Sequence, residues 1–144
     1  VAADAPLQLR YERDDTDDTL RRRYVTRQVR QRMHQRSFRD RVLRAYREQC
    51  SICRLKHADL LDAAHITPDR DDEGEPIVSN GLSLCKMHHA AFDRSYFGIR
   101  PDYRVVVRPE IMREKDGPML KAGLQAIDDS KLVLPRSIRD RPDT

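Results

Sequence analysis

Four candidate metal ligands, arranged in two pairs, constrain what this chain of 144 residues can fold into more than any other feature. Two cysteines form a C-x-x-C pair, and about thirty residues later a third cysteine precedes a histidine with the same spacing. Two thiolates on a tight knuckle occupy two corners of a tetrahedron, and the second pair supplies the other two. The four residues are Cys50, Cys53, Cys85 and His88. They predict a closed, structural zinc site.

The alternative is that these cysteines are small buried residues that bind no metal. An isolated cysteine favours that alternative, whereas C-x-x-C followed by C-x-x-H favours zinc. His57 is a competing fourth ligand, which we rank below His88. With 38% hydrophobic and 36% charged residues, the chain buries only a modest core, and a structural zinc contributes on the order of 10 kcal/mol to folding. Three cysteines also fit a reducing compartment, so we expect a cytoplasmic protein.

Arginines are concentrated between Leu20 and Gln49, where eleven of them stand against two acidic residues. Guanidinium groups match phosphate oxygens, and their binding releases counterions from a nucleic acid. A solvated helix face is the alternative, but the imbalance of charge favours nucleic acid. The residues that we expect to contact DNA are Arg30, Arg36, Arg39, Arg44 and, further along the chain, Arg104.

The N-terminal part of the chain is predicted to precede the folded domain. Residues 1–18 are poor in hydrophobic residues and carry an acidic patch, which indicates a linker. Because the chain begins with Val1 rather than Met, we expect a piece of a longer protein. Residues 19–36 are predicted to form an arginine-rich helical arm. A folded domain is predicted over residues 37–134, followed by a flexible tail at 135–144.

Within the predicted domain, the first element is a helix that starts at Ser37, which can cap it together with Asp40, and ends near Gln49. A strand is predicted over residues 60–66, ended by the proline that follows. A polar loop precedes a helix predicted over residues 81–95. A hairpin should then turn at Pro101–Asp102, before one short helix and an edge strand. This order of elements predicts an α+β fold with a zinc knuckle near its start and a C-terminal β-hairpin.

Two adjacent histidines on the helix predicted at 81–95 cannot point the same way. At about 100° per residue, His89 lies about 100° from His88, while Asp93 lies only about 40° from His89. His89 and Asp93 could therefore chelate a second ion, and the alternative for Asp93 is a solvent-facing acid paired with Arg94. His65, at the end of the predicted strand, could face this ion, although a lone strand histidine is more often a satisfied core residue.

The run C-x-x-C … AAHI-x-P … NGL-x-LC-x-x-HH-x-x-FD resembles the HNH family of nucleases, which have a ββα-metal fold. The chain looks most like the cleavage module of bacterial modification-dependent restriction enzymes. The resemblance covers residues 37–108, and the three letters of the family name fall on His65, Asn80 and His89. It implies a two-stranded ribbon and a helix that hold one divalent ion against a scissile phosphate.

The resemblance also implies a role for each matching residue. His65 would be the general base that takes a proton from the attacking water. His89 would be a metal ligand, and Asp93 stands where some relatives carry a second ligand. Asn80 would brace the loop and orient His65, although it could also be a helix cap ahead of Gly81. The ion would stabilise charge on the leaving oxygen.

One position departs from the family pattern. Many relatives have an acidic residue or a histidine immediately before the general base, where this chain has Ala64. Either His89 and Asp93 hold the ion together with water and phosphate oxygens, which we prefer, or Asp62, on the same strand face as Ala64, replaces the missing ligand. An oxygen-rich site suits Mg²⁺ or Mn²⁺, while imidazole ligation allows Ni²⁺, Co²⁺ or Zn²⁺.

The metal-ligand pattern and the arginine-rich segment predict a metal-dependent DNA endonuclease. The resemblance implies that it serves as the cleavage module of a restriction enzyme acting on modified DNA, and by the same analogy we expect an upstream DNA-recognition domain in the same chain. A double-strand break usually needs two active sites, so we expect a homodimer. The alternative is a zinc-stapled module that binds nucleic acid without cutting it, and Ala64 keeps this alternative open. A zinc-dependent hydrolase of small molecules is the weakest reading, because the chain is poor in pocket-forming aromatic residues. No apolar stretch approaches a membrane span, so no membrane partner is expected.

Overall fold

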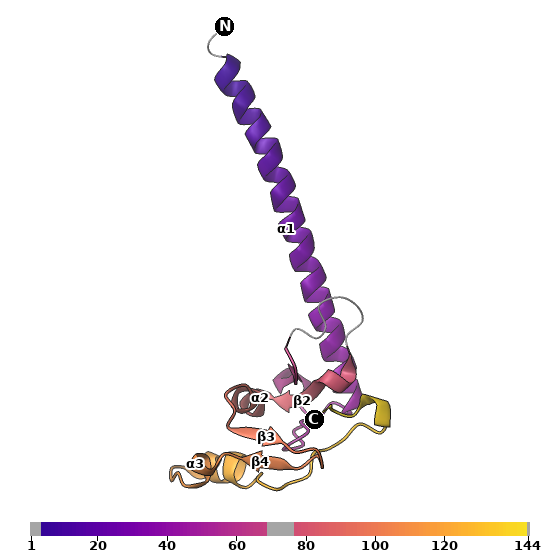
Figure 1. Ribbon diagram of the computed structural model, residues 1–144, viewed down its shortest axis with the longest axis vertical. Helices are drawn as coiled ribbons and strands as arrows, with labels where there is room; N and C mark the ends of the chain where they lie inside the picture. The colour runs from indigo at the N-terminus through magenta and orange to yellow at the C-terminus, as the bar shows by residue number, and fades with distance from the viewer. Residues whose placement is uncertain (1–3, 69–76, 144) are drawn as a thin grey trace. The chain divides into compact units, whose positions relative to one another are not determined.

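The computed structural model describes residues 4–68 and 77–143, with side chains from residue 17 onward. The chain divides into two compact units, Val1–Arg36 and Ser37–Thr144. The second unit contains both helices and strands (Figure 1), so the predicted α+β class is confirmed. Most of the predicted polar loop lies outside the described residues. No helix in the described part of the chain combines the length and the apolar character that a membrane crossing needs.

Helix α1 runs without interruption over Asp4–Ala45. Neither glycine nor proline occurs between Pro6 and Gln49, so no residue of this interval breaks the helix. The prediction of a separate helix that begins at Ser37 is therefore wrong, because Ser37 lies inside α1 and cannot serve as its N-cap. Part of the predicted linker, residues 4–18, is likewise helical.

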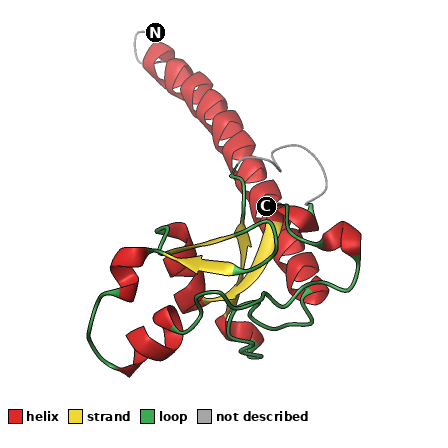
Figure 2. Ribbon diagram, turned by 60° about the horizontal axis from the view of Figure 1, so that its bottom comes forward, coloured by secondary structure: helices red, strands yellow, loops and turns green. Residues whose placement is uncertain are grey.

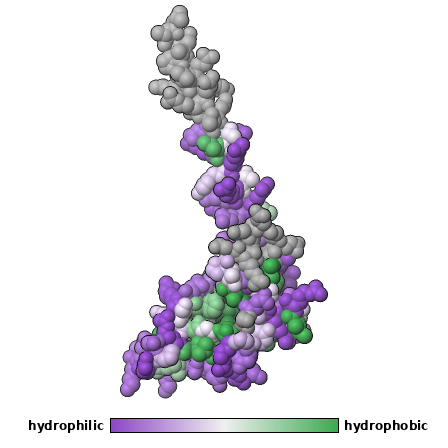
Figure 3. Space-filling model, in the orientation of Figure 1, coloured by the Kyte–Doolittle hydropathy of each residue, from purple (hydrophilic) through white to green (hydrophobic). Residues whose placement is uncertain are grey.

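The described side chains of the first unit are mostly exposed, and Figure 3 shows this part of α1 as largely hydrophilic. Its hydrophobic residues do not gather into one apolar face. Ion pairs one helical turn apart stabilise the helix instead: Arg21 lies 3.4 Å from Asp17, and Arg22 lies 2.9 Å from Asp18. Each of these exposed pairs is worth a few tenths of a kcal/mol, roughly 0.3–0.5.

The second unit is built around an antiparallel ribbon of β1 (Leu61–His65) and β2 (Gly81–Cys85), followed directly by helix α2 (Lys86–Asp93). The register pairs Leu61 with Cys85 and His65 with Gly81. The prediction of one helix over residues 81–95 is therefore wrong for its first five residues, which form β2. All five are buried, so the strand lacks the polar alternation that marks a strand with one solvated face.

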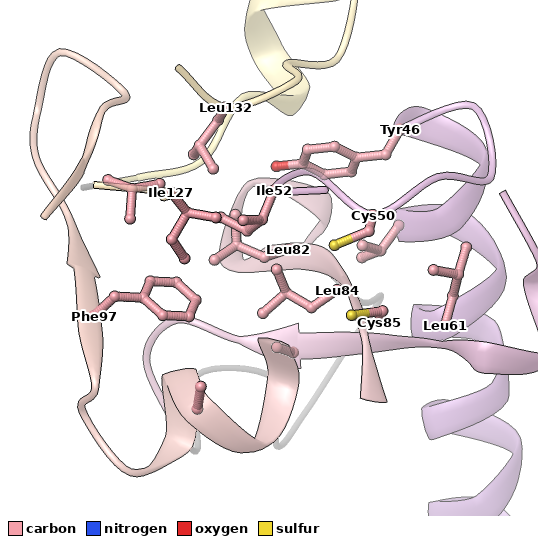
Figure 4. Close-up of a cluster of buried hydrophobic side chains, with 14 of the residues drawn as sticks. Tyr46, Cys50, Ile52, Leu61, Leu82, Leu84, Cys85, Phe97, Ile127 and Leu132 are labelled. Atoms are coloured by element: carbon pink, nitrogen blue, oxygen red, sulfur yellow. The ribbon is translucent and has the colours of Figure 1, made fainter. Parts of the chain in front are cut away.

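The last turns of α1 pack directly on this ribbon. A Cβ at Gly81 would lie 2.6 Å from Cγ2 of Val42 and 2.8 Å from Cζ of Phe38, so only glycine allows this approach. Side chains from the C-terminal part of the chain complete the core, as Figure 4 shows for Ile127 and Leu132 beside Leu82.

After α2, the strands β3 (Phe97–Ile99) and β4 (Val105–Val107) pair antiparallel, with Pro101–Asp102 between them. Figure 2 shows the strands in the middle of this unit with short helices around them. These helices include α3 (Pro109–Met112) and a π-helical segment at Leu120–Gln125. The predicted edge strand is reduced to a single bridge between Lys131 and Arg104. Near the C-terminus, the amide of Asp143 donates a hydrogen bond to Ser79 O at 2.9 Å.

Candidate metal centre and active site

The four predicted zinc ligands lie together in the fold. One ligand atom from each of them falls within 4.8 Å of all the others. Sγ of Cys53 and of Cys85 are 3.9 Å apart, and Nδ1 of His88 lies 3.2 Å from Sγ of Cys85 and 3.6 Å from Sγ of Cys50. A tetrahedral zinc with ordinary bond lengths has S···S edges of about 3.8 Å and S···N edges of about 3.6 Å. The cluster therefore fits a metal such as zinc, and the competing ligand His57 is not part of it.

Backbone hydrogen bonds hold the first pair of cysteines in a knuckle. The amide of Cys50 donates to Leu55 O at 2.9 Å, and the amide of Arg54, which has a φ of 64°, donates to Cys50 O at 3.0 Å. The knuckle is fixed to β2 because the amide of Ser51 donates to Ser83 O at 2.8 Å. Since β2 ends at Cys85, the ribbon carries the second half of the cluster to the first.

His88 is held with the correct nitrogen toward the thiols. It is 1% exposed, and its Nε2 lies 2.7 Å from Gly123 O. A carbonyl can only accept, so Nε2 carries the proton and Nδ1 is left as a lone pair that faces the sulfur atoms. Such a second bond on a ligating histidine fixes its tautomer and its ring orientation. Gly123 lies in the π-helical segment, so this distant part of the chain completes the centre.

The three thiols of the cluster differ in pKa. A hydrogen bond from Cys85 lowers the pKa of Cys50 to about 3, against the opposing effect of burial. The same bond raises the pKa of Cys85, and burial raises the pKa of Cys53. One thiolate is thus stabilised at the expense of the other two thiols. A divalent cation stabilises several thiolates at once, so it favours the deprotonated form of all three cysteines.

His89 points to a different place and lies between two carboxylates. Its Nδ1 is 2.8 Å from Oδ2 of Asp62, and its Nε2 is 3.3 Å from Oδ2 of Asp93. The shorter distance is that of a hydrogen bond, in which Nδ1–H donates. The longer distance fits two ligands of one ion, which are about 3.0 Å apart when each lies about 2.1 Å from it at a right angle. Asp62 and Asp93 approach opposite nitrogens, so the two carboxylates cannot both join an ion bound at Nε2.

The carboxylate of Asp62 accepts hydrogen bonds from two side chains. Its Oδ1 accepts a hydrogen bond from Nζ of Lys86, while Oδ2 accepts from His89. Partial burial raises the pKa of Asp62, but these two partners outweigh it and leave the pKa below its ordinary value. Asp62 is therefore a carboxylate that fixes the imidazole of His89.

His65 ends β1 at the surface and lines a cavity of about 590 Å³ together with Asp93 and Arg108. The other walls are largely apolar and include Phe92 and Val107. The predicted base and one predicted metal ligand thus share one cavity. Arg108 was not selected from the sequence, although its position immediately after β4 is a signal that could have identified it.

Asn80 lies beside the exit of β1. It is fully buried, its Oδ1 accepts a hydrogen bond from the amide of Thr67 at 2.9 Å, and its Nδ2 donates to Thr67 O at 3.0 Å. The alternative of a helix cap ahead of Gly81 is wrong, because Gly81 begins a strand.

The five arginines predicted to contact DNA differ in their surroundings. Arg30, Arg36 and Arg44 are exposed. Arg39 instead donates from Nη2 to Ala58 O at 2.8 Å, and Arg104 donates from Nη1 to Asp129 O at 2.7 Å. The guanidinium groups of these last two residues are used within the fold, which the charge pattern of the sequence does not reveal.

Comparison with known proteins bears on the motif rather than on the whole chain. Residues 50–100 match the sequence model of a family described as HNH endonuclease. No curated protein gives a match. Among solved structures, the chain is similar to a "Modification dependent TagI restriction endonuclease", with 21% identity and a TM-score of 0.45. The similarity covers 73% of this chain and 33% of that protein, so the chain spans about a third of its length.

The family match confirms the resemblance found in the sequence. The matching residues 50–100 contain the complete Cys3His cluster together with the cavity histidine and the His–Asp pair of α2.

Proposed function

We propose that this chain is a metal-dependent endonuclease that hydrolyses phosphodiester bonds of DNA. One observation carries the proposal: His65 and Asp93 line the same cavity, and Asp93 lies 3.3 Å from Nε2 of His89, within a segment that matches the HNH family. A general base and one member of a metal-ligand pair on the same cavity are groups that metal-dependent phosphodiester hydrolysis uses.

In the proposed reaction, His65 takes a proton from a water molecule whose oxygen attacks phosphorus. The new P–O bond forms as one ester P–O bond breaks, and the leaving oxygen departs with the electrons of that bond. A divalent ion held by His89 and Asp93 would neutralise the charge on this oxygen. Mg²⁺ or Mn²⁺ suits the carboxylate and the phosphate oxygens, and the imidazole also allows Ni²⁺ or Co²⁺.

Asp62 serves as a positioning residue in this proposal. Its hydrogen bond to Nδ1 of His89 supports the assignment of Nε2 as the metal ligand. In this arrangement, Asp62 does not replace the metal ligand that many relatives carry at the position of Ala64. Water or phosphate oxygens fill the remaining coordination positions of the ion. Asn80 holds the backbone of Thr67, two residues after His65, and so supports the end of the strand that carries the base.

Arg108 is proposed to bind a phosphate of the substrate strand. Its guanidinium lies in the cavity wall, 6.0 Å from the ring centroid of Tyr96, and its side chain is 44% exposed. Its acidic neighbour Glu110 is 4.0 Å away, too far for a hydrogen bond. Arg30, Arg36 and Arg44 are proposed to contact the DNA backbone elsewhere.

The Cys3His cluster is proposed to hold a structural zinc that stabilises the second unit, with no open position for catalysis. The closest alternative function is a zinc-stapled module that binds DNA without cutting it. The choice of modified DNA and the assembly into a dimer are proposed from the motif resemblance alone. They are tested with modified and unmodified plasmids and by sedimentation of the complex.

A supercoiled plasmid assay at low salt tests the proposed function. Wild type, His65→Ala and the control His57→Ala are compared with Mg²⁺, Mn²⁺, Ni²⁺ or EDTA, and DNA affinity is measured in EDTA. We expect metal-dependent nicking or linearisation by wild type and by His57→Ala, and its loss in His65→Ala with affinity retained. DNA binding without cutting in any metal would leave the binding module as the function.

A further inference from the structure

We propose that Phe38 is a positioning residue for the active site: its ring holds the imidazole of His65 in the orientation that the reaction uses. The catalytic part of this inference rests on the proposed function, whereas the contact itself belongs to the fold. Phe38 lies on α1, outside the segment that matches the HNH family, so the family motif does not contain it.

The two rings are stacked face to face. Their centroids are 4.1 Å apart, and their planes differ by 10°. Phe38 is 2% exposed, whereas His65 is exposed and lines the cavity. Face-to-face stacking on an aromatic ring restricts the rotamers open to an imidazole. The buried ring supplies a flat support of this kind on one face of the imidazole.

The support itself is held rigidly. Gly81 is the ribbon partner of His65, and a Cβ on it would come 2.8 Å from Cζ of Phe38. The ring of Phe38 is therefore confined by the backbone of β2 at its edge and by the imidazole on its face. Any side chain at position 81 would displace the ring, and His65 would lose its support.

A plain core residue is the alternative role for Phe38, and Val42 provides the matched comparison. Val42 lies one turn further along α1, is fully buried, and approaches the same Gly81. Its side chain belongs to the core rather than to the stack. A loss of packing affects both residues, whereas a loss of the stack affects Phe38 alone.

The test compares wild type, Phe38→Leu, Phe38→Met and Val42→Ala as full chains. The kcat and KM of plasmid nicking are measured at a temperature at which circular dichroism shows all four folded. NMR spectra of the histidine ring protons, assigned with His65→Ala, report the stack directly, since protons above an aromatic ring are shifted upfield.

We expect both Phe38 variants to lower kcat by about tenfold or more with little change in KM, because a small misplacement of a catalytic group has effects of this size. Their His65 ring protons should move downfield. Val42→Ala should keep the kcat and the shifts of wild type. Unchanged kcat in both Phe38 variants, with an active wild type, would overturn the inference and leave the proposed function standing.

If wild type cuts no DNA, the proposed function fails and the NMR shifts decide on the contact alone. Ring protons of His65 that do not move in Phe38→Leu would then refute the stack. Equal losses of kcat in Val42→Ala and Phe38→Leu would assign Phe38 to the core and also overturn the inference.

Discussion

His88 and His89 are neighbours in the sequence, but their rings meet different partners. His88 turns Nδ1 to the cysteine thiols, and Gly123 O fixes its other nitrogen at 2.7 Å. His89 lies about 100° further around α2 and meets Asp62 and Asp93. In each histidine, a hydrogen bond at one ring nitrogen leaves the lone pair of the other ring nitrogen available to a metal ion.

Asp62→Asn is expected to weaken the catalytic metal site while leaving the fold intact. The amide cannot accept from His89 with the strength of a carboxylate, and loss of such a partner typically costs about 10–100-fold in metal affinity or activity. The Mn²⁺ concentration for half-maximal cleavage should rise by a factor in this range. The control is Asp59→Asn, an exposed acid three positions away on the chain. Equal metal dependence in both variants would refute the positioning role of Asp62.

Arg108→Ala is expected to raise the KM for DNA cleavage severalfold with a smaller effect on stability, because its side chain lies in the cavity wall and not in the core. Steady-state cleavage of a labelled duplex measures this. Arg113→Ala removes a more exposed arginine, with 74% of its side chain exposed, from outside the cavity and should behave as wild type. If Arg108→Ala and Arg113→Ala have the same KM, Arg108 does not bind the substrate.

At the scale of elements, the knuckle, β2 and α2 form one assembly around the cysteine cluster. The knuckle hydrogen-bonds to β2, and Cys85 is both the last residue of β2 and the N-cap of α2, where its Sγ accepts from the amide of His88 at 3.4 Å. The ribbon on which His65 stands is therefore tied to the metal centre at its other end.

Cys53→Ser is expected to lower the bound zinc from one ion per chain to a small fraction and to lower the melting temperature substantially. A structural zinc accounts for roughly 10 kcal/mol of apparent binding free energy, comparable to the whole stability of a small domain. Atomic absorption and thermal denaturation measure the two effects. His57→Ala, which alters the rejected fourth ligand, should retain both zinc and stability. A full zinc content in Cys53→Ser would remove Cys53 from the ligand set.

At the scale of the whole molecule, some arginines form hydrogen bonds within the fold and others are exposed to solvent. Arg39 and Arg104 bind backbone carbonyls inside the second unit. The arginines of the first unit lie on a helix whose described residues are mostly exposed. Charge density therefore overstates how many guanidinium groups are available for phosphate.

The double variant Arg30→Gln, Arg36→Gln is expected to weaken DNA binding in proportion to its lost charge. Each lost phosphate contact should reduce the slope of log affinity against log salt by about 0.9. Fluorescence anisotropy in EDTA at several salt concentrations measures this slope. Arg39→Gln should instead lower the melting temperature, because it leaves the carbonyl of Ala58 without this donor. An unchanged salt slope in the double variant would exclude these residues from the DNA contact.

Local spacing alone was enough to identify the candidate ligands. Cys85 and His88 are three residues apart, and His89 and Asp93 are four, so a single helical turn brings each pair together. The C-x-x-C knuckle is equally local. All of these residues lie within the segment that matches the HNH family model.

Only the tertiary structure decided the rest. The sequence by itself indicated the α+β class, the two halves of the Cys3His cluster and the His–Asp pair, because the residues of each half and of the pair are close neighbours along the chain. It did not determine the stack of Phe38 on His65, the bond from Asp62 to His89, or the anchoring of Arg39, because each joins residues about twenty or more positions apart. β2 was missed for a related reason: burial on both faces removes the alternation that marks a strand. Packing between distant segments leaves no local pattern, and here it orients the groups of the proposed active site.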